Sequence, residues 1–372
     1  MKAEVSAARS DGRRLARSMA AGVGALALAW AAGTARAGLP AYTLVGGFDL
    51  PTGTASYDVL PDGTVLALAG RTIYRQVSVE GGFVEAGRLP EGAVASYGAS
   101  FLRVSPDGLH AAAGNNLLGS AARVHTFDVA GLSPGVDAEI RSFAADNTDA
   151  QWADNDTLFV TGTPGASSVV TRIETAGPGS SAVVVSNIGG SAGGIVTRGG
   201  YLFTGNGFDF APGGSDVGEV RAFALDAIDA LTPGTSIDFE ASGVAVADAL
   251  SGAALAFDAL GNLLVGGGDI FGGSGDFGSL AVVDGDALVA ALGGGGPVPD
   301  AFELRLTPLD AGYSYFARVN PATSRVYVTW FDNTTFAAGD RVLVYEVPAP
   351  GAAALLLAAA GSAGRRRRGR GS

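Results

Sequence analysis

The 372-residue sequence contains no cysteine, and it has only two histidines and two methionines. Without cysteine there is no disulfide, no thiolate nucleophile and no metal site built on sulfur. The missing disulfides do not exclude export, because a domain of about 300 residues buries enough apolar surface to fold without them. The scarcity of histidine leaves few side chains for acid–base catalysis near neutral pH, which weighs against an enzyme.

Lysine is also nearly absent: Lys2 is the only one, and every other base except the histidines is arginine. Residues 1–37 hold six of the 24 Lys and Arg residues and residues 365–372 hold five, so residues 38–346 keep 13. The same body holds 34 of the 36 acidic residues, which gives it a net charge of −21. Such a surface repels nucleic acid and anionic lipid and favours divalent cations.

The first 37 residues have the three parts of a secretory signal peptide. Basic residues from Lys2 to Arg17 come first, and an apolar stretch follows from Met19 to Ala32. Small residues at Ala35 and Ala37 then match the pattern of a signal peptidase site. The sequence predicts cleavage after Ala37; a permanent N-terminal anchor is the alternative.

A second targeting pattern lies near the C-terminus. It begins with Val347, Pro348, Ala349 and Pro350, continues with 14 residues made only of Ala, Leu, Gly and Ser, and ends with four arginines, Arg365, Arg366, Arg367 and Arg368. Proline cannot continue a strand or helix interior, so the Pro-x-Pro pair separates the body from the apolar run. This run is shorter than the roughly 20 residues that span a bilayer core, and the arginines hold its end at the cytoplasmic face.

This layout resembles the PEP-CTERM sorting tail of bacterial envelope proteins, with Ala349 where that family has glutamate. The resemblance implies that an exosortase-type membrane peptidase recognises the tail and processes it near Val347-Pro348, with transient membrane anchoring before cleavage. It also implies export to the bacterial cell envelope, cell surface or extracellular matrix, and association with exopolysaccharide or surface proteins. The predicted organisation is therefore a signal peptide (1–37), a body (38–346), a sorting tail (347–368) and a terminal extension (369–372).

Within the body, one unit recurs six times: an apolar strand, a tight polar turn, a second apolar strand, a Gly-rich loop and a third strand. The turns lie at Asp62-Gly63, Asp107-Gly108, Asn155-Asp156, Gly199-Gly200, Gly261-Asn262 and Thr323-Ser324. Gly, Asn and Asp tolerate the positive φ that such hairpin turns need. A hairpin unit every 40 to 60 residues is typical of a β-propeller.

The sequence thus predicts an all-β fold, a six- or seven-bladed propeller, with a pair of β-sandwich domains as the alternative. The last two intervals between turns are longer than the others, and the fifth leaves room for a seventh blade. Residues 42–45 precede the first unit, so we expect them to form the outermost strand of the last blade and to close the ring. Short helices are expected over 226–231 and 286–292.

No motif for catalysis is convincing. Residues 189–193 match G-x-S-x-G around Ser191, but that pattern requires a strand-to-helix turn with a histidine later in the chain. Both histidines, His110 and His125, come earlier. The match is therefore interpreted as a coincidence in a glycine-rich chain, and the histidines as solvated or hydrogen-bonded surface side chains.

Acidic Gly-rich loops between the second and third strands are the best candidate for a metal site. Calcium prefers carboxylate and carbonyl oxygens, and glycines let the backbone fold around the ion. No calcium motif is matched, so solvated loops are the alternative. The candidate ligands are Asp209, Asp216, Glu219, Asp269 and Asp276.

Together these features predict an exported, non-catalytic binding or structural protein that presents loops on a rigid scaffold. No cofactor is established by the sequence, and calcium is the one candidate. A propeller enzyme of lyase, lactonase or glycosidase type, with a calcium-assisted site in the central channel, is the alternative. Channel-facing acids together with a histidine would favour that alternative.

Overall fold

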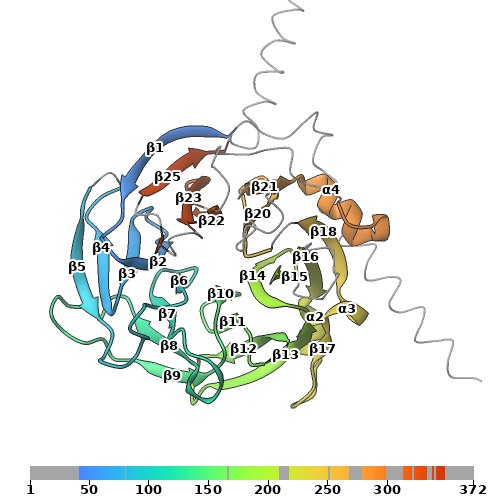
Figure 1. Cartoon of the computed structure of the whole chain (residues 1–372), viewed down its shortest axis with the longest axis horizontal. Helices are drawn as coiled ribbons and strands as arrows, with labels where there is room; N and C mark the ends of the chain where they lie inside the picture. The colour runs from blue at the N-terminus through green and yellow to red at the C-terminus, as the bar shows by residue number, and fades with distance from the viewer. Residues whose placement is uncertain are drawn as a thin grey trace, which may run out of the picture. The chain divides into compact units, whose positions relative to one another are not determined.

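Six antiparallel sheets form the blades of a β-propeller in the computed structural model (Figure 1), and each contains one of the six predicted hairpin units. The sandwich alternative and the seventh blade are therefore both wrong. The structure describes residues 42–79, 81–165, 167–208, 218–249, 252–267, 279–298, 313–320, 322–332, 337–338 and 341–347.

The first three blades follow one another along the chain. Blade 1 consists of β2 (Thr54–Val59), β3 (Val65–Ala69), β4 (Thr72–Gln76) and β5 (Phe83–Arg88). Blade 2 consists of β6 (Leu102–Val104), β7 (His110–Gly114), β8 (Arg123–Asp128) and β9 (Arg141–Ala144). Blade 3 consists of β10 (Asp149–Trp152), β11 (Thr157–Gly162), β12 (Ser168–Glu174) and β13 (Ser180–Ile188), with a parallel edge strand β17 (Ile237–Asp238).

The other three blades are less regular. Blade 4 consists of β14 (Ser191–Arg198), β15 (Tyr201–Phe208), β16 (Gly218–Ala224) and β18 (Val244–Ala249). Blade 5 has three strands among the described residues, β19 (Ala254–Phe257), β20 (Leu263–Gly267) and β21 (Ser279–Val283). Blade 6 consists of β22 (Tyr313–Asn320), β23 (Arg325–Asp332), β25 (Arg341–Glu346) and β1 (Thr43–Asp49), with β24 (Ala337–Ala338) beside β23.

The ring closes as the sequence predicts. Strand β1 pairs antiparallel with β25 and is the outermost strand of blade 6, so blade 6 combines the first strand of the body with its last. The register brings Thr43 opposite Glu346, which places the two ends of the body side by side. Pairing the terminal strands removes an open edge between the first and last blades.

The two long intervals between turns hold other elements rather than a seventh blade. The first contains α2 (Leu225–Asp229), β17, α3 (Phe239–Ser242) and β18. The second contains α4 (Gly285–Ala290) and the π-helical turn η2 (Ala291–Gly295), besides residues 268–278 and 299–312, which lie outside the described residues. The helices α2 and α4 confirm the two predicted ones, and α3 was not predicted.

The apolar core is divided among the spaces between neighbouring blades. The middle strands of a blade have neighbours on both faces, so β11 and β20 are buried along their whole length. Between blades 4 and 5, for example, Phe203 and Phe257 meet edge-to-face with ring centroids 5.0 Å apart. Similar clusters lie between blades 1 and 2, 2 and 3, 3 and 4, and 6 and 1.

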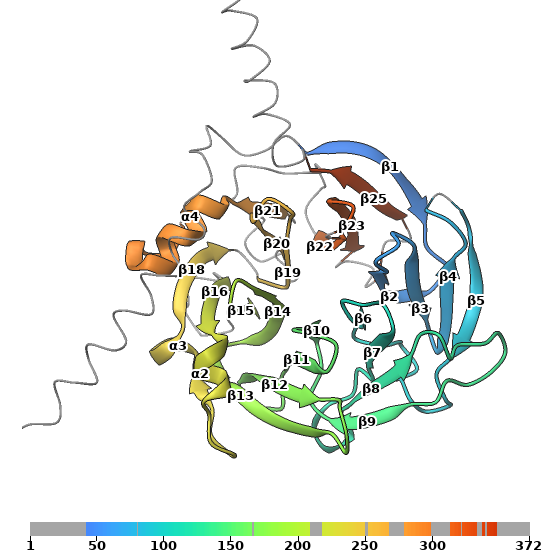
Figure 2. The ribbon, with the colours of Figure 1, turned by 180° about the vertical axis from the view of Figure 1, so that it is seen from behind.

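The first strand of each blade lies nearest the axis (Figures 1 and 2). Each of these inner strands, β2, β6, β10, β14, β19 and β22, contacts the inner strand of both neighbouring blades. Side chains also bond across the boundaries: Asn320 Nδ2 donates to the carbonyl oxygen of Leu60 at 2.7 Å. Thr161 Oγ1 donates to the carbonyl oxygen of Gly193 at 2.8 Å.

The search for membrane spans found none in the part of the chain that the structure describes: no helix there combines the length and the apolar character required.

Candidate functional site

A cavity of about 370 Å³ lies where the inner strands end. All six inner strands run the same way along the axis, because every blade starts there with its first strand. Their carboxyl ends therefore meet at one mouth, beside the tight turns between first and second strands. Each strand contributes to the lining, for example through Asp58, Arg103, Trp152, Arg198 and Arg318. We call this space the axial cavity.

Two arginines dominate the axial cavity. Arg103, on β6, is only 5% exposed, and Arg318, on β22, is half-buried. Arg103 donates through Nε to the carbonyl oxygen of Ala150 at 2.5 Å and through Nη2 to Asp149. Arg318 donates through Nη1 to the carbonyl oxygen of Ala317 at 2.9 Å, and its Nη2 lies 4.0 Å from Asp149 Oδ1. One carboxylate thus serves two guanidinium groups.

Each arginine has a buried nitrogen that makes no hydrogen bond. Within the described part of the chain, Nη1 of Arg103 and Nε of Arg318 have almost no solvent-accessible surface and no hydrogen-bond partner. A buried N–H without an acceptor costs roughly 1–3 kcal/mol, more where the group is charged. The pair therefore carries N–H groups that bond neither to the described residues nor to solvent.

The pKa of Arg103 shows that its charge is also unfavourable in this position. Burial lowers the pKa of Arg103, the charge of Arg318 lowers it further, and the carboxylates of Asp149 and Asp58 act in the opposite direction. Burial also raises the pKa of the nearby Tyr57 hydroxyl, which keeps that group neutral. The two like charges are held close together in a poorly hydrated space, where their repulsion is strong.

Asp58 supplies the second carboxylate of the axial cavity. Its Oδ1 accepts the backbone N–H of Val59 at 2.9 Å, and its Oδ2 accepts that of Val104 at 2.7 Å. A carboxylate has about four acceptor sites, so each oxygen of Asp58 retains a lone pair after these bonds. Asp58 links blades 1 and 2 and can still accept a hydrogen bond from a hydroxyl group of a ligand.

The lining of the axial cavity also includes Trp152 and Phe257. Trp152 is 2% exposed and donates its indole N–H to the carbonyl oxygen of Arg103 at 3.2 Å. The Arg198 guanidinium carbon lies 5.2 Å from the Phe257 ring centroid. Burial lowers the pKa of Arg198, and the charge of Asp258 opposes that shift. The cavity therefore combines charged donors with apolar and aromatic side chains.

Four of the five predicted calcium ligands lie outside the residues that the structure describes. Asp209, Asp216, Asp269 and Asp276 lie outside the described residues, as do Ala35 and Ala37 at the predicted signal cleavage and Pro348, Ala349, Pro350 and Arg365, Arg366, Arg367 and Arg368 of the tail. Glu219 is described: it is half-buried, and its Oε2 pairs with Arg221 Nε at 2.8 Å. Among the described residues, no group of three acidic or histidine side chains is arranged to hold a metal. The calcium site stays a prediction.

Glu219 and the axial cavity lie at opposite ends of blade 4. Arg198 pairs with Tyr201 at the end that borders the cavity, whereas Ser191 pairs with Phe208 at the other end. Glu219 follows that other end, since Gly205 pairs with Val220. The described strand ends that flank the predicted loop of blade 4, at Phe208 and Gly218, therefore lie on the face opposite the cavity mouth.

The predicted end of the body is also visible. Val347 is 4% exposed, and its backbone N–H donates to the carbonyl oxygen of Ser324 at 3.3 Å. The first residue of the predicted tail therefore packs against the propeller.

The two histidines do not meet. His110 Nδ1 lies 2.8 Å from Asp128 Oδ1 at the surface, and His125 Nδ1 lies 2.8 Å from Ser142 Oγ. The interpretation of both as surface side chains fails for His125, which is only 5% exposed. Neither histidine lines the axial cavity, so the described lining lacks the histidine that would favour the enzyme alternative.

The G-x-S-x-G match has a structural role in place of a catalytic one. Ser191 begins β14, and no helix follows it. Gly193 and Gly194 lie where β14 of blade 4 runs close to the backbone of blade 5. A Cβ at Gly194 would lie 2.5 Å from the backbone nitrogen of Leu255, and one at Gly193 would lie 2.5 Å from the carbonyl oxygen of Gly252. Only glycine fits at these two positions.

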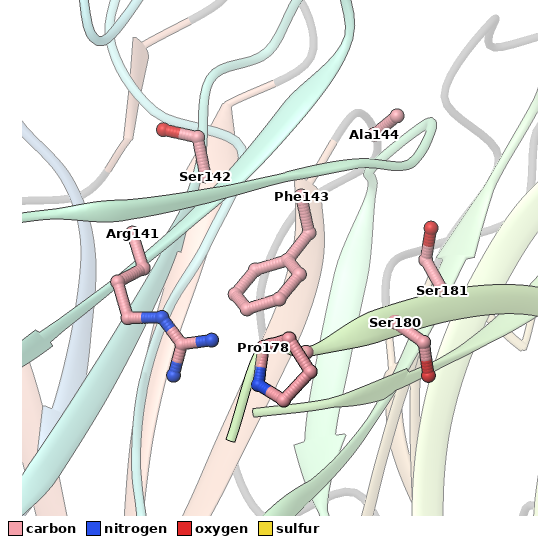
Figure 3. Close-up of a pocket in the computed structure, with 8 residues that line it drawn as sticks. Arg141, Ser142, Phe143, Ala144, Pro178, Ser180 and Ser181 are labelled. Carbon is pink, nitrogen blue, oxygen red and sulfur yellow. The ribbon is translucent and has the colours of Figure 1, made fainter. Parts of the chain in front are cut away.

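A larger depression, of about 450 Å³, lies at the periphery between β9 and β13 (Figure 3). Figure 3 shows the Phe143 ring beside Pro178 with the Arg141 side chain next to it. Arg141 donates to the carbonyl oxygens of Thr175 and Gly177, and its guanidinium carbon lies 5.4 Å from the Phe143 ring centroid. Because this arginine already holds blades 2 and 3 together, the depression offers little for a ligand. The axial cavity is the better candidate.

Comparisons with known proteins assign the chain to no family. No protein-family model matches the chain, and no curated protein sequence does. Among solved structures, a chain of the mitotic checkpoint complex is 12% identical, with a TM-score of 0.45, over 93% of this chain and 99% of that one. A protein provisionally assigned as a gluconolactonase is 13% identical, with a TM-score of 0.47, over 83% of this chain and 98% of that one. Neither likeness extends to function.

Sequence reasoning did not find the axial cavity. Arg103, Asp149 and Arg318 lie in three different repeats and form no local motif. One signal was available: each arginine interrupts an otherwise apolar first strand at the predicted inner position. An unpaired charge in such a strand indicates a channel.

Proposed function

We propose that this protein is an exported six-bladed propeller that a C-terminal sorting tail delivers to the bacterial cell surface or extracellular matrix. There it acts as a binding scaffold without catalytic activity. An exosortase-type peptidase would process the tail after transient anchoring, and exopolysaccharide or surface proteins would be the partners. The body's net charge of −21 is consistent with a solvated surface that avoids nucleic acid.

One observation carries the proposal: the pairing of β1 with β25. The predicted leader ends a few residues before β1, and the predicted tail starts directly after β25. Since Thr43 lies opposite Glu346, both targeting segments join the propeller at the outer edge of blade 6. Removal of either segment would leave this strand pair, and the inner strands that line the axial cavity, intact.

The test is expression of the full chain in a bacterium that has an exosortase, followed by cell fractionation and intact-mass measurement. We expect a mature mass that starts at Gly38 and ends near Val347, with protein at the surface or in the medium. Replacing the four arginines, R365S/R366S/R367S/R368S, should leave the tail unprocessed. Replacing Ala37 by Leu should leave the leader in place.

A matched control replaces two exposed arginines of the body, R71S/R75S, whose side chains are 38% and 44% exposed. These variants should mature and distribute like the original protein. Cytoplasmic accumulation of the uncleaved chain, or identical processing with and without the four tail arginines, would contradict the proposal.

A further inference from the structure

We propose that the axial cavity binds a small polyhydroxylated carboxylate, such as a hexuronate, with its carboxylate held by Arg103 and Arg318. This inference deepens the proposed binding role and rests on it only for biological meaning. The binding itself depends on the described residues alone.

The charge of the ligand follows from the arginine pair. Arg103 and Arg318 share Asp149, and each has a buried nitrogen without a hydrogen-bond partner among the described residues. A second carboxylate beside them would accept hydrogen bonds and reduce the repulsion between the two cations. Guanidinium groups match the planar, two-oxygen geometry of a carboxylate better than an ammonium would.

The hydroxyl groups of the ligand follow from Asp58. Both of its oxygens already accept one backbone N–H, from Val59 and Val104, and a carboxylate can only accept. An anionic group of the ligand would be repelled by Asp58 and could not donate a hydrogen bond to it, whereas a hydroxyl group can donate one. The ligand that satisfies both the arginine pair and Asp58 therefore carries a carboxylate and hydroxyls in one small molecule.

The ring of the ligand follows from the apolar part of the lining and the size of the cavity. The half-buried side chains of Val59, Val104 and Val319 belong to the lining, and the C–H face of a sugar ring is also apolar. A volume of about 370 Å³ lies within the range of small-molecule sites. A free monosaccharide and the terminal residue of an acidic polysaccharide both carry this chemistry.

Calorimetric titration of the full chain separates these requirements. Glucuronate has the carboxylate and the hydroxyls, glucose has only the hydroxyls, and acetate has only the carboxylate. We expect saturable binding of glucuronate that is at least about tenfold tighter than that of either partial ligand, since a hydrogen bond to a charged group contributes roughly 1.5–3 kcal/mol. A glucuronate-terminated oligosaccharide then tells the two sources apart: tighter binding than the monomer indicates a polysaccharide end, and equal binding indicates the free sugar.

Variants of the axial cavity test the assignment of the charges. Arg318→Gln removes a guanidinium that approaches Asp149 and, among the described residues, bonds only to the carbonyl oxygen of Ala317. The variant should weaken glucuronate binding at least about tenfold. Asp149→Asn removes the competing carboxylate and should tighten it severalfold. The matched control is Arg123→Gln, because Arg123 is also half-buried and bonds to the carbonyl oxygen of Ala122 at 2.6 Å but lies outside the cavity. It should leave binding unchanged.

Circular dichroism of each variant confirms that the fold persists, and the inorganic phosphate ion serves as a further anion. Equal affinity for glucose and glucuronate would overturn the role of the arginines. Equal affinity for acetate, phosphate and glucuronate would overturn the role of Asp58, and no saturable binding of any would overturn the site. None of these failures changes where the protein is exported, so failure here and failure of the proposed function are distinguishable.

Discussion

Apolar side chains fill the spaces between the blades, whereas charged side chains lie along the axis of the propeller. Between blades 4 and 5, the cluster around Phe203 is wholly apolar, and its stability comes from removing hydrocarbon from water. On the axis, Arg103, Arg318, Asp149 and Asp58 are packed among inner strands, where charge is costly unless it is paired. The comparison teaches that the wedges between blades stabilise the fold, whereas the axis retains unused binding capacity.

The largest expected effect on stability comes from removing a large side chain from the apolar core between two blades. Phe203 is fully buried and its ring meets Phe257 edge-to-face. Phe203→Ala should lower the free energy of unfolding by about 3–5 kcal/mol, because apolar contact is lost and a cavity remains. Urea unfolding measures this, and Leu118→Ala, at a side chain 75% exposed, should change little. A loss below about 1 kcal/mol at Phe203 would show that the wedge is not the source of stability.

The next effect comes from breaking the charge pair on the axis. Arg103→Met leaves the buried carboxylate of Asp149 with only the more distant Arg318, and should cost about 3 kcal/mol. The double variant Arg103→Met/Asp149→Leu removes both charges and should recover much of that loss. The unfolding midpoints of the single and the double variant measure how much of the stability is recovered. If the double variant is no more stable than the single one, the ion pair itself stabilises the axis and the comparison is wrong.

A smaller effect tests how closely the inner strands approach. Gly194→Ala would place a Cβ 2.5 Å from the backbone nitrogen of Leu255, and a backbone atom cannot yield as a flexible side chain would. We expect a loss of about 2 kcal/mol, measured by thermal or urea unfolding. Gly46→Ala is the control, because nothing lies within 4 Å of a Cβ there. Equal stability of the two variants would mean that the inner strands of blades 4 and 5 can move apart freely.

The smallest effect concerns a titratable group in a buried position. Burial lowers the pKa of His125 below the usual 6.5; a contact with the Ala93 backbone opposes this shift, and the charge of Arg123 adds to it. Below pH 6.5 this histidine is protonated in the unfolded chain but stays neutral in the folded protein until the pH approaches its lower folded pKa. Stability should therefore be complete above about pH 6.5 and fall as the pH drops toward the folded pKa, with a slope of at most about 1.4 kcal/mol per pH unit for one proton.

Unfolding of the original protein and of His125→Gln across pH 5 to 7.5 isolates this contribution. The original protein should lose stability relative to the variant as the pH falls. Parallel curves for the two proteins would show that His125 is protonated equally in both states.

Much of the fold could be predicted from the sequence because its signals are local. Gly63, Gly108 and Gly261 have φ of +85°, +74° and +94°, as the hairpin turns require. The closing strand could be predicted as well, since an apolar strand before the first unit needs a partner. Helix α3 and strand β17 could not, because β17 has two residues and depends on the parallel edge offered by β13.

The sequence by itself determined the repeating hairpins, the strand that closes the ring and the two segments that predict export and sorting, because each is written in adjacent residues. Only the tertiary structure decided the axial cavity. Arg103 and Asp149 are 46 residues apart, and Arg318 belongs to the last blade. These charges meet because ring closure brings the carboxyl ends of six inner strands to one point, and no local pattern encodes how side chains from separate repeats face one another across an axis.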